Sequence, residues 1–319
     1  MDRLLAVAAV LAAALCFATT GTSRALADVG ADAVSIGAAR VLIGGGLLAL
    51  VAWAGWARVR RAGGVAAGET GAPADRVPLA PRVPAPAVVL VGAAGVLAYQ
   101  PTFFSGAAAN GVAVGTVVAL GSAPIATGLL VSVLRRRLPD ARWILATGIA
   151  IVGVAIVSGV FGAGTLAARP AGILASLAAG ASYALYAVAA KELLERGWSA
   201  SGAMGGIFGV AAALSLPVLL LTDASWLATP AGATLALWLG VVTVTVAYLL
   251  FGWGLRRLSP TTVSTLTLAE PLGATLLGLV VLGEQLSPVS AVGVGVIALG
   301  LVLVALPAGR GGERVAAAS

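Results

Sequence analysis

The chain contains no histidine, one cysteine and one lysine among its 319 residues. Without histidine, the sequence excludes histidine relays, histidine-ligated metals and Ser-His or Cys-His catalysis. The single cysteine, Cys16, has no partner for a disulfide. The single lysine, Lys191, lies outside any G-x-x-x-x-G-K-[ST] motif, which excludes a nucleotide-driven motor of that kind. These absences predict a protein that is not an enzyme and that holds no cofactor or metal.

Charged residues are scarce as well. They make up 10% of the chain, whereas hydrophobic residues make up 60% and the mean hydropathy is +1.06. Soluble domains average about 25% charged residues. Apolar windows of ~20 residues, the helical length that crosses a ~30 Å hydrocarbon layer, recur along the whole chain. This pattern predicts an all-α integral membrane protein with ten transmembrane helices. The predicted spans are residues 4–22, 32–54, 87–107, 110–133, 142–161, 171–190, 201–221, 232–254, 260–282 and 288–306.

The basic residues fall mainly on one side of these spans. If the N-terminus is cytoplasmic, sixteen of the nineteen Lys and Arg lie in cytoplasmic segments, two lie outside and one, Arg40, lies within a helix. Basic segments resist translocation, so this bias predicts that both termini are cytoplasmic. It also explains the net charge of +7 without a nucleic-acid partner. A secretory signal ending at "ALA", residues 25–27, is an alternative, but its removal would leave nine helices.

The chain also contains an internal repeat. When Pro124 is aligned with Pro271, two pairs of glycines come into register without a gap. Each unit holds five helices, and because five is odd the second unit must enter the membrane from the opposite side. The sequence therefore predicts two inverted repeats, over residues 1–161 and 162–306. It also predicts a cytoplasmic linker over 57–86 and a cytoplasmic tail over 307–319. The aligned glycines are Gly148 with Gly295 and Gly153 with Gly300.

Inverted repeats suit a task that treats both membrane faces alike. A pseudo-two-fold axis in the membrane plane gives two arrangements of similar energy, one open to each side, with a shared site near the midplane. We therefore expect transport by alternating access. A duplication retained only because it makes a stable bundle is the alternative, and the protein would then be a sensor or scaffold that does not transport.

Several longer segments carry a further pattern. They include Arg40 in "SIGAARVLIGGGLLAL", "ASYALYAVAAKEL" at the start of the second half, and "AYLLFGWGLRRLSPTTVSTLTLAEPLGATLLGLVVLGEQLSP" with a weaker counterpart around Pro124. With the ten-helix layout, these segments resemble the drug/metabolite transporter superfamily, specifically its EamA type. The first half departs from the family pattern, since "VLRRRLPD" replaces the usual acidic turn. The resemblance implies a carrier of the bacterial inner membrane, usually an exporter of amino acids or related metabolites, with helices around a central cavity.

Polar side chains at membrane depth cost free energy unless they face the interior of the bundle. In the first helix Thr19 and Thr20 share a face with Cys16 and Ser23, because the spacing is i, i+3, i+4 and i+7. We expect this face and the polar residues of three other helices to line an uncharged, hydrogen-bonding and partly aromatic cavity. Packing between helices is the alternative for each. The other candidates are Tyr99 and Gln100 in the third helix, Tyr183 and Tyr186 in the sixth, and Tyr248 in the eighth.

Two charges are expected near the middle of the membrane. At ~1.5 Å per residue, Arg40 lies ~12 Å from one end of its span and Glu270 ~15 Å from the other side. An isolated charge at this depth costs roughly 2.5 to 3.5 kcal/mol on insertion scales, so the two are candidates to pair. In one interpretation Glu270 exchanges a proton or binds the amine of a substrate as the pair breaks. In the other, a static ion pair fixes two helices.

The sequence thus predicts a secondary transporter that exports a small metabolite such as an amino acid. We expect it in the lipid bilayer as a monomer or weak oligomer, with a proton as the candidate coupled ion. One alternative is a flippase for a lipid-linked or amphiphilic molecule, which needs a lateral opening and a basic site for the phosphate. The other is the sensor or scaffold described above.

Overall fold

The computed structural model describes residues 2–61, 83–158, 169–283, 285 and 287–306, and within these residues every regular element is a helix. The first half contains α1 (Asp2–Ala27), α2 (Ala33–Arg61), α3 (Ala85–Arg135) and α4 (Ala141–Val157). The second half contains α5 (Pro170–Glu195), α6 (Ala200–Leu220), the 3-10 helix η1 (Ser225–Ala228), α7 (Pro230–Gly240), the π-helix η2 (Val241–Val246), α8 (Ala247–Leu255), α9 (Pro260–Leu266), α10 (Ala269–Val281) and α11 (Pro288–Ala305).

The helices correspond to the predicted membrane spans. In the described part of the chain nine helical segments are long and apolar enough to cross a membrane, and α4 is a shorter apolar helix of 17 residues. Within α3 two spans, 85–111 and 114–135, meet at Gly111, whose φ of 82° is readily available to glycine. The segments α7, η2 and α8 make one span, and α9 and α10 another. The predicted all-helical membrane fold is confirmed.

The linker begins later than predicted. Helix α2 continues to Arg61 instead of ending near residue 54. Three arginines in its last turn complement the negative end of the helix dipole, and the guanidinium of Arg60 lies 4.4 Å from the ring centre of Trp56. Residues 62–82 of the expected linker and the whole tail, 307–319, lie outside the described residues.

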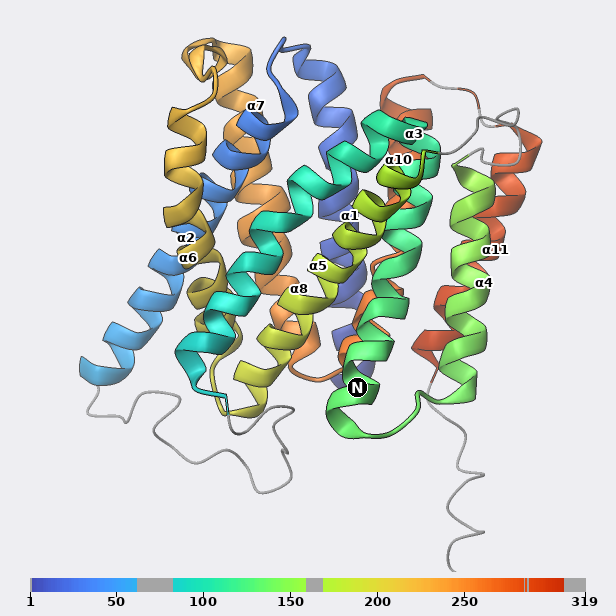
Figure 1. Ribbon diagram of the computed structural model, residues 1–319, viewed down its shortest axis with the longest axis horizontal. Coiled ribbons are helices and arrows are strands. Elements are labelled where there is room, and N and C mark those ends of the chain that lie inside the picture. Colours follow the sequence, from blue (N-terminus) through green and yellow to red (C-terminus); the bar gives the residue numbers. More distant parts are fainter. Residues whose placement is uncertain (1, 62–82, 159–168, 284, 286, 307–319) are drawn as a thin grey trace, which may run out of the picture.

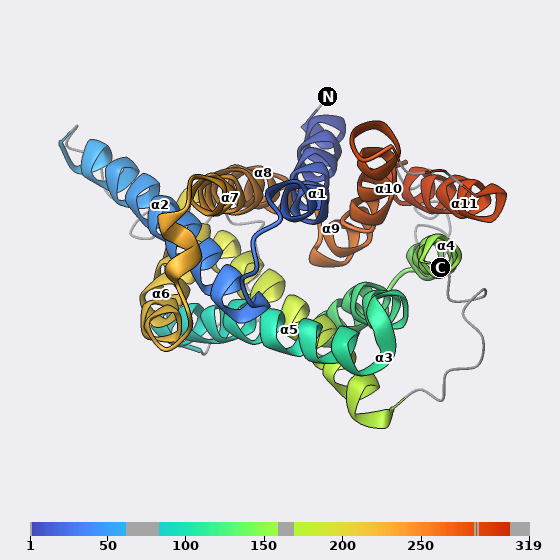
Figure 2. The same cartoon turned by 90° about the horizontal axis from the view of Figure 1, so that it is seen from above.

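The packing of the helices follows the symmetry of the repeat. Helix α3 packs against α5, and correspondingly α8 and α10 pack against α1, while α2 pairs with α6 and α4 with α11. Seen from above, the α2–α6 pair and the α4–α11 pair lie at opposite sides of the bundle (Figure 2). Two glycines that the repeat aligns make reciprocal contacts, Gly153 of α4 with Ile297 and Gly300 of α11 with Ala150. The two repeats thus contact each other through pairs of corresponding helices.

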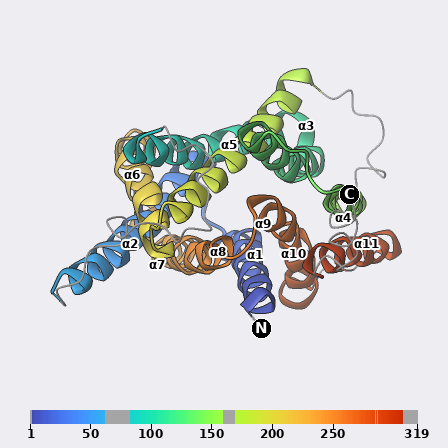
Figure 3. The same ribbon diagram turned by 90° about the horizontal axis from the view of Figure 1, so that it is seen from below.

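One end of the bundle is strongly basic. Helix α1 begins there, and α2, α5, α8 and α11 end there (Figures 1 and 3). Of the fifteen Lys and Arg in the described residues, twelve lie at this end, which we call the basic end. Arg24 and Arg169 lie at the opposite end, and Arg40 lies within α2.

The predicted span 260–282 is not one continuous helix. It is interrupted between Leu266 and Ala269, just before Glu270. Pro271 has no N–H to bond the carbonyl of Thr267, its usual helical partner. That carbonyl accepts the N–H of Glu270 instead, at 2.9 Å, in a tighter turn. The break places Glu270 in the first turn of α10.

Candidate functional site

A cavity within the bundle brings together residues from both halves of the chain. It is enclosed by α1, α2, α3, α5, α6, the η2–α8 segment and the break between α9 and α10. Its volume is about 80 Å³. Seven of the nine residues expected to form a site line it. These are Arg40, Tyr99, Gln100, Tyr183, Tyr186, Tyr248 and Glu270.

Arg40 reaches the cavity from the second turn of α2 and is half-buried. Its Nη2 donates to the backbone carbonyl of Thr243, at 3.3 Å. Thr243 belongs to η2, the π-helical segment, and π-bulges inside helices occur often at functional sites. The contact with Thr243 holds the guanidinium on the η2 side of the cavity.

Glu270 reaches the same cavity from the start of α10 and is half-buried. Among the described residues, no Lys or Arg forms an ion pair with its carboxylate within 4.0 Å, and no group donates a hydrogen bond to it. Arg40 and Glu270 therefore share a cavity without pairing with each other. The static ion pair that would have fixed two helices is not formed.

Aromatic side chains form much of the remaining wall. The hydroxyl of Tyr183 lies 3.1 Å from that of Thr267, and the hydroxyl of Tyr248 donates to that of Tyr186 at 3.3 Å. The ring centres of Tyr183 and Tyr186 are 5.0 Å apart. The cavity therefore offers phenolic hydroxyls and ring faces together.

Two phenylalanines complete this wall and were not expected. The ring centre of Tyr248 lies 5.1 Å from that of Phe17 and 4.1 Å from that of Phe208. A phenylalanine in an apolar helix carries no polar group that sets it apart from ordinary packing residues. A signal existed for Phe17, because the repeat aligns it with Tyr183.

Thr19 and Thr20 do not lie where they were expected, since neither is among the residues that line the cavity. Thr19 lies in a groove between α1, α7 and α10. Its hydroxyl donates to the carbonyl of Cys16 at 2.7 Å and accepts from Nε1 of Trp238 at 3.0 Å. Phe17 faces the cavity, and a residue two positions further is rotated by about 200° around an α-helix. Thr20 is half-buried outside the lining.

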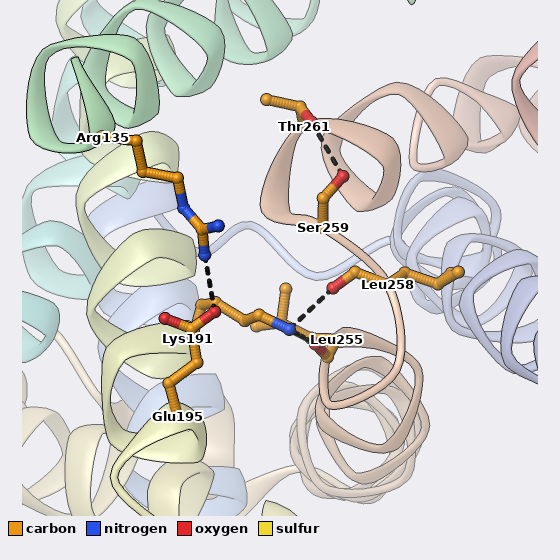
Figure 4. Close-up of polar contacts among 7 residues, drawn as sticks. All are labelled: Arg135, Lys191, Glu195, Leu255, Leu258, Ser259 and Thr261. Atoms are coloured by element: carbon orange, nitrogen blue, oxygen red, sulfur yellow. Dashed lines mark hydrogen bonds and ion pairs between the residues drawn. The ribbon is translucent and has the colours of Figure 1, made fainter. Parts of the chain in front are cut away.

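A second group of ionisable residues lies at the end of α5, where the sequence predicted only loop charges. Lys191 is buried, and its Nζ donates to the carbonyls of Leu255 and Leu258 at 2.9 Å each (Figure 4). These carbonyls lie at the end of α8 and in the turn to α9. The lysine thus joins α5 to the end of α8 and to the turn before α9 at the basic end.

The acids next to Lys191 form ion pairs. Glu195 pairs with Arg135 at the end of α3, with 2.8 Å between Oε1 and Nη2 (Figure 4). Glu192 pairs with Arg196 at 2.6 Å, one helical turn further on. We call Arg135, Lys191, Glu192, Glu195 and Arg196 the α5 ion cluster. The i, i+4 spacing of Glu192 and Arg196 was a usable sequence signal for a helix that continues past residue 190.

Comparisons with known proteins agree with this architecture. Residues 170–306 match the EamA-like transporter family. Over 296 residues the chain is 36% identical to the uncharacterized transporter YwfM of Bacillus subtilis (strain 168), and the match covers 92% of each chain. A solved crystal structure, described only as that of a protein, is 20% identical to the chain. It superimposes with a TM-score of 0.71 over 93% of this chain and 95% of the other.

Proposed function

The chain belongs to the EamA-like transporter family of the drug/metabolite transporter superfamily, and we propose that it exports a small zwitterionic metabolite, such as an amino acid, by alternating access. The observation that carries the proposal is the pair of opposite charges in the central cavity. Arg40 and Glu270 line the same space but are not paired with each other. Two such charges suit a substrate that brings one charge of each sign.

The energetics of the membrane interior support this assignment. A charge at this depth costs roughly 2.5 to 3.5 kcal/mol on insertion scales. A substrate carboxylate on Arg40 and a substrate ammonium on Glu270 would offset both costs together. The faces of Tyr186 and Tyr248 add cation–π attraction for the ammonium group. A substrate with a single charge would satisfy one side of the cavity and leave the other unpaired.

The small size of the cavity supports alternating access, in which the helices around the site move. Its volume of about 80 Å³ is smaller than the ~300 to 1,000 Å³ of usual ligand pockets, so the walls must separate to admit a metabolite. The inverted repeats provide two related arrangements between which the helices can move. Two walls depart from regular α-helix, at η2 and at the α9–α10 break, and irregular backbone at membrane depth is expected next to a cavity.

We place the basic end in the cytoplasm and the protein in a bacterial inner membrane. The support is the concentration of twelve of the fifteen described basic residues at that end. Both termini would then be cytoplasmic. Export carries the substrate from the basic end to the opposite end.

Counterflow in proteoliposomes tests the substrate class. The proteoliposomes are loaded with an unlabelled amino acid. Entry of the same amino acid in labelled form is then followed in the presence of three competitors that share its side chain. We expect the parent amino acid to compete, and its methyl ester and its decarboxylated amine to compete at least tenfold less, because a lost charge-assisted hydrogen bond costs about 1.5 to 3 kcal/mol. Equal competition by all three would exclude recognition of a zwitterion.

Proton exchange by Glu270 is a second candidate role. It is favoured by the carboxylate's lack of hydrogen-bond donors among the described residues and its place beside Arg40 in the cavity. If Glu270 carries a coupled proton, E270Q should transport without any response to an imposed pH gradient. Transport by E270Q at the full rate, with unchanged dependence on pH, would remove Glu270 from the coupling step.

A flippase activity has weaker support. The groove that contains Thr19 has a volume of about 620 Å³, but its described lining holds no Arg or Lys for a phosphate. The polar or amphipathic residues of this lining are Thr19, Thr22, Ser23, Thr234 and Trp238. Movement of a fluorescent lipid between the leaflets of proteoliposomes is therefore expected to be no faster than in protein-free vesicles.

A further inference from the structure

A second cavity lies at the basic end, away from the proposed substrate site. It is bounded by the start of α1, the end of α3, the start of α4, α9 and the end of α11. Its volume is about 300 Å³. Asp140 is the one acidic residue among the described residues of its wall, against four arginines. The arginines are Arg3, Arg135, Arg137 and Arg142.

Two of these arginines hold the end of α11. Nη2 of Arg142 donates to the carbonyl of Leu303 at 2.8 Å, and Nη2 of Arg3 donates to that of Val304 at 3.3 Å. Both guanidinium groups also reach the carbonyl of Leu306. The last carbonyls of a helix lack partners within it, so this contact stabilises the helix end. It also fixes where two positive charges stand in the cavity wall.

Arg137 takes no part in that contact. The preceding residue, Arg136, has a left-handed backbone with φ 52°, which is unfavourable for most residues other than glycine. The N–H groups of Arg136 and Arg137 both bond to the carbonyl of Ser132, and this turn brings Arg137 to the cavity wall. In the described part of the chain, the side chain of Arg137 has no hydrogen-bond or ion-pair partner. Holding α11 therefore does not account for this arginine.

The remaining wall adds neutral donors. Hydroxyl groups of Ser259 and Thr261, 2.8 Å apart at the start of α9, line the cavity on the side across from Arg135 (Figure 4). Arg135 itself is paired with Glu195. When Asp140 and Glu195 are counted against the four arginines, a net positive charge of two remains. Guanidinium and hydroxyl donors around an excess of positive charge are suited to phosphate oxygens.

We propose that this cavity binds a phosphate group, and that the phosphate belongs to the headgroup of an anionic membrane lipid. The cavity lies where the helices end, and its lining includes Leu138 and Leu306, which are 90% and 50% exposed. A phospholipid matches both features, with its phosphate on the arginines and its glycerol and acyl groups on the leucines. Basic pockets between transmembrane helices bind anionic headgroups through this combination. The proposal is independent of the substrate of the central cavity.

Thermal unfolding of the purified protein in detergent tests the site. The protein is titrated with short-chain phosphatidylglycerol, with phosphatidylcholine of the same chain length, and with inorganic phosphate, because a ligand raises the midpoint according to its affinity. We expect phosphatidylglycerol alone to raise it. R137Q should weaken phosphatidylglycerol about fivefold, as expected for one arginine close to a headgroup. R137K should retain most of the affinity.

R61Q is the matched control, because Arg61 is an exposed arginine at the end of α2 on the same side of the bundle. It should change the affinity by about twofold at most, since exposed and distant charges are screened. Equal weakening by R61Q and R137Q would assign binding to the whole basic surface and overturn the cavity. Stabilisation by inorganic phosphate with the same dependence on Arg137 would overturn the lipid assignment. No response to either phosphate source would overturn both.

Discussion

The central cavity and the α5 ion cluster use ionisable residues in opposite ways. In the cluster, each acid has a basic partner within the chain, Glu195 with Arg135 and Glu192 with Arg196. In the cavity, Arg40 and Glu270 face the same space and are not paired with each other. Both groups lie in helices of the same bundle, so lipid alone does not explain the difference.

The difference separates charges that hold the fold from charges that are available to a ligand. Burying an ion pair is tolerable when hydrogen bonds satisfy both partners, and removing one partner then leaves a costly unpaired charge. Lys191 and Oε1 of Glu195 are satisfied in this way, whereas Oε2 of Glu195 has no hydrogen-bond partner among the described residues. Arg40 is held by one backbone carbonyl, and Glu270 has no donor among the described residues. The comparison predicts that the cluster controls stability and that the cavity controls transport.

The largest expected effect comes from the cluster. K191M removes the buried ammonium group from the carbonyls of Leu255 and Leu258 and takes away one of the two positive charges near Glu195, leaving that of Arg135. We expect the free energy of unfolding in detergent to fall by about 3 kcal/mol. R61Q, an exposed change at the same end, should shift it by about 0.5 kcal/mol or less. Equal stability of K191M and R61Q would show that the cluster does not hold the helices.

Arg40 tests the other side of the comparison. R40Q should weaken substrate binding roughly 10- to 100-fold in counterflow, because a hydrogen bond to a charged group contributes about 1.5 to 3 kcal/mol. Its free energy of unfolding should stay within about 1 kcal/mol of the wild-type value, because among the described residues Arg40 has no ion-pair partner that the substitution would leave unpaired.

R58Q is the control for Arg40, because Arg58 lies on the same helix at its exposed end. It should transport normally. If R40Q instead lost stability as K191M does, with unchanged binding by the folded fraction, the two groups of charges would have the same structural role.

Substitution of Tyr183 should have a smaller effect, and it tests whether the position of Glu270 matters for transport. Its hydroxyl contacts Thr267, whose carbonyl accepts the N–H of Glu270. Y183F removes one hydrogen bond, worth about 1 kcal/mol, and should weaken transport of a zwitterion several-fold by loosening the turn that carries the carboxylate. Y186F loses the contact with Tyr248 and leaves Thr267 in place, so it should have the weaker effect. A stronger effect of Y186F would contradict this arrangement.

The fold could be predicted because lipid imposes constraints that a single sequence records. Twenty-residue apolar windows and one-sided basic residues follow from crossing the bilayer, and they define the helices and their alternation. The break before Glu270 is different. Pro124 and Pro271 are aligned in the repeat, yet α3 continues through Pro124 and the helix is interrupted only near Pro271. The surroundings of each proline decide this, and no local sequence pattern records them.

The candidate site was predictable for the same reason where a side chain is costly in lipid. Arg40 and Glu270 have few places to lie except a cavity, and the cavity contains both. Hydroxyl groups are less informative, because Ser and Thr can bond to their own helix, as Thr19 does to the carbonyl of Cys16. The rotation of α1 about its axis is set by its packing against α8 and α10. That rotation brought Phe17 into the cavity and Thr19 into the groove.

Thr19 therefore provides the smallest effect and the most direct test of where the cavity ends. T19V removes the acceptor for Nε1 of Trp238 in the groove, and we expect a loss of stability of about 1 kcal/mol or less with unchanged transport. T20V, at a position outside the cavity lining, should also transport normally. Counterflow and thermal unfolding measure both variants. Because a valine replaces a threonine with little change in shape, a drop in transport for T19V would come from its lost hydroxyl. Such a drop would extend the substrate site beyond the charged cavity into the groove between α1, α7 and α10.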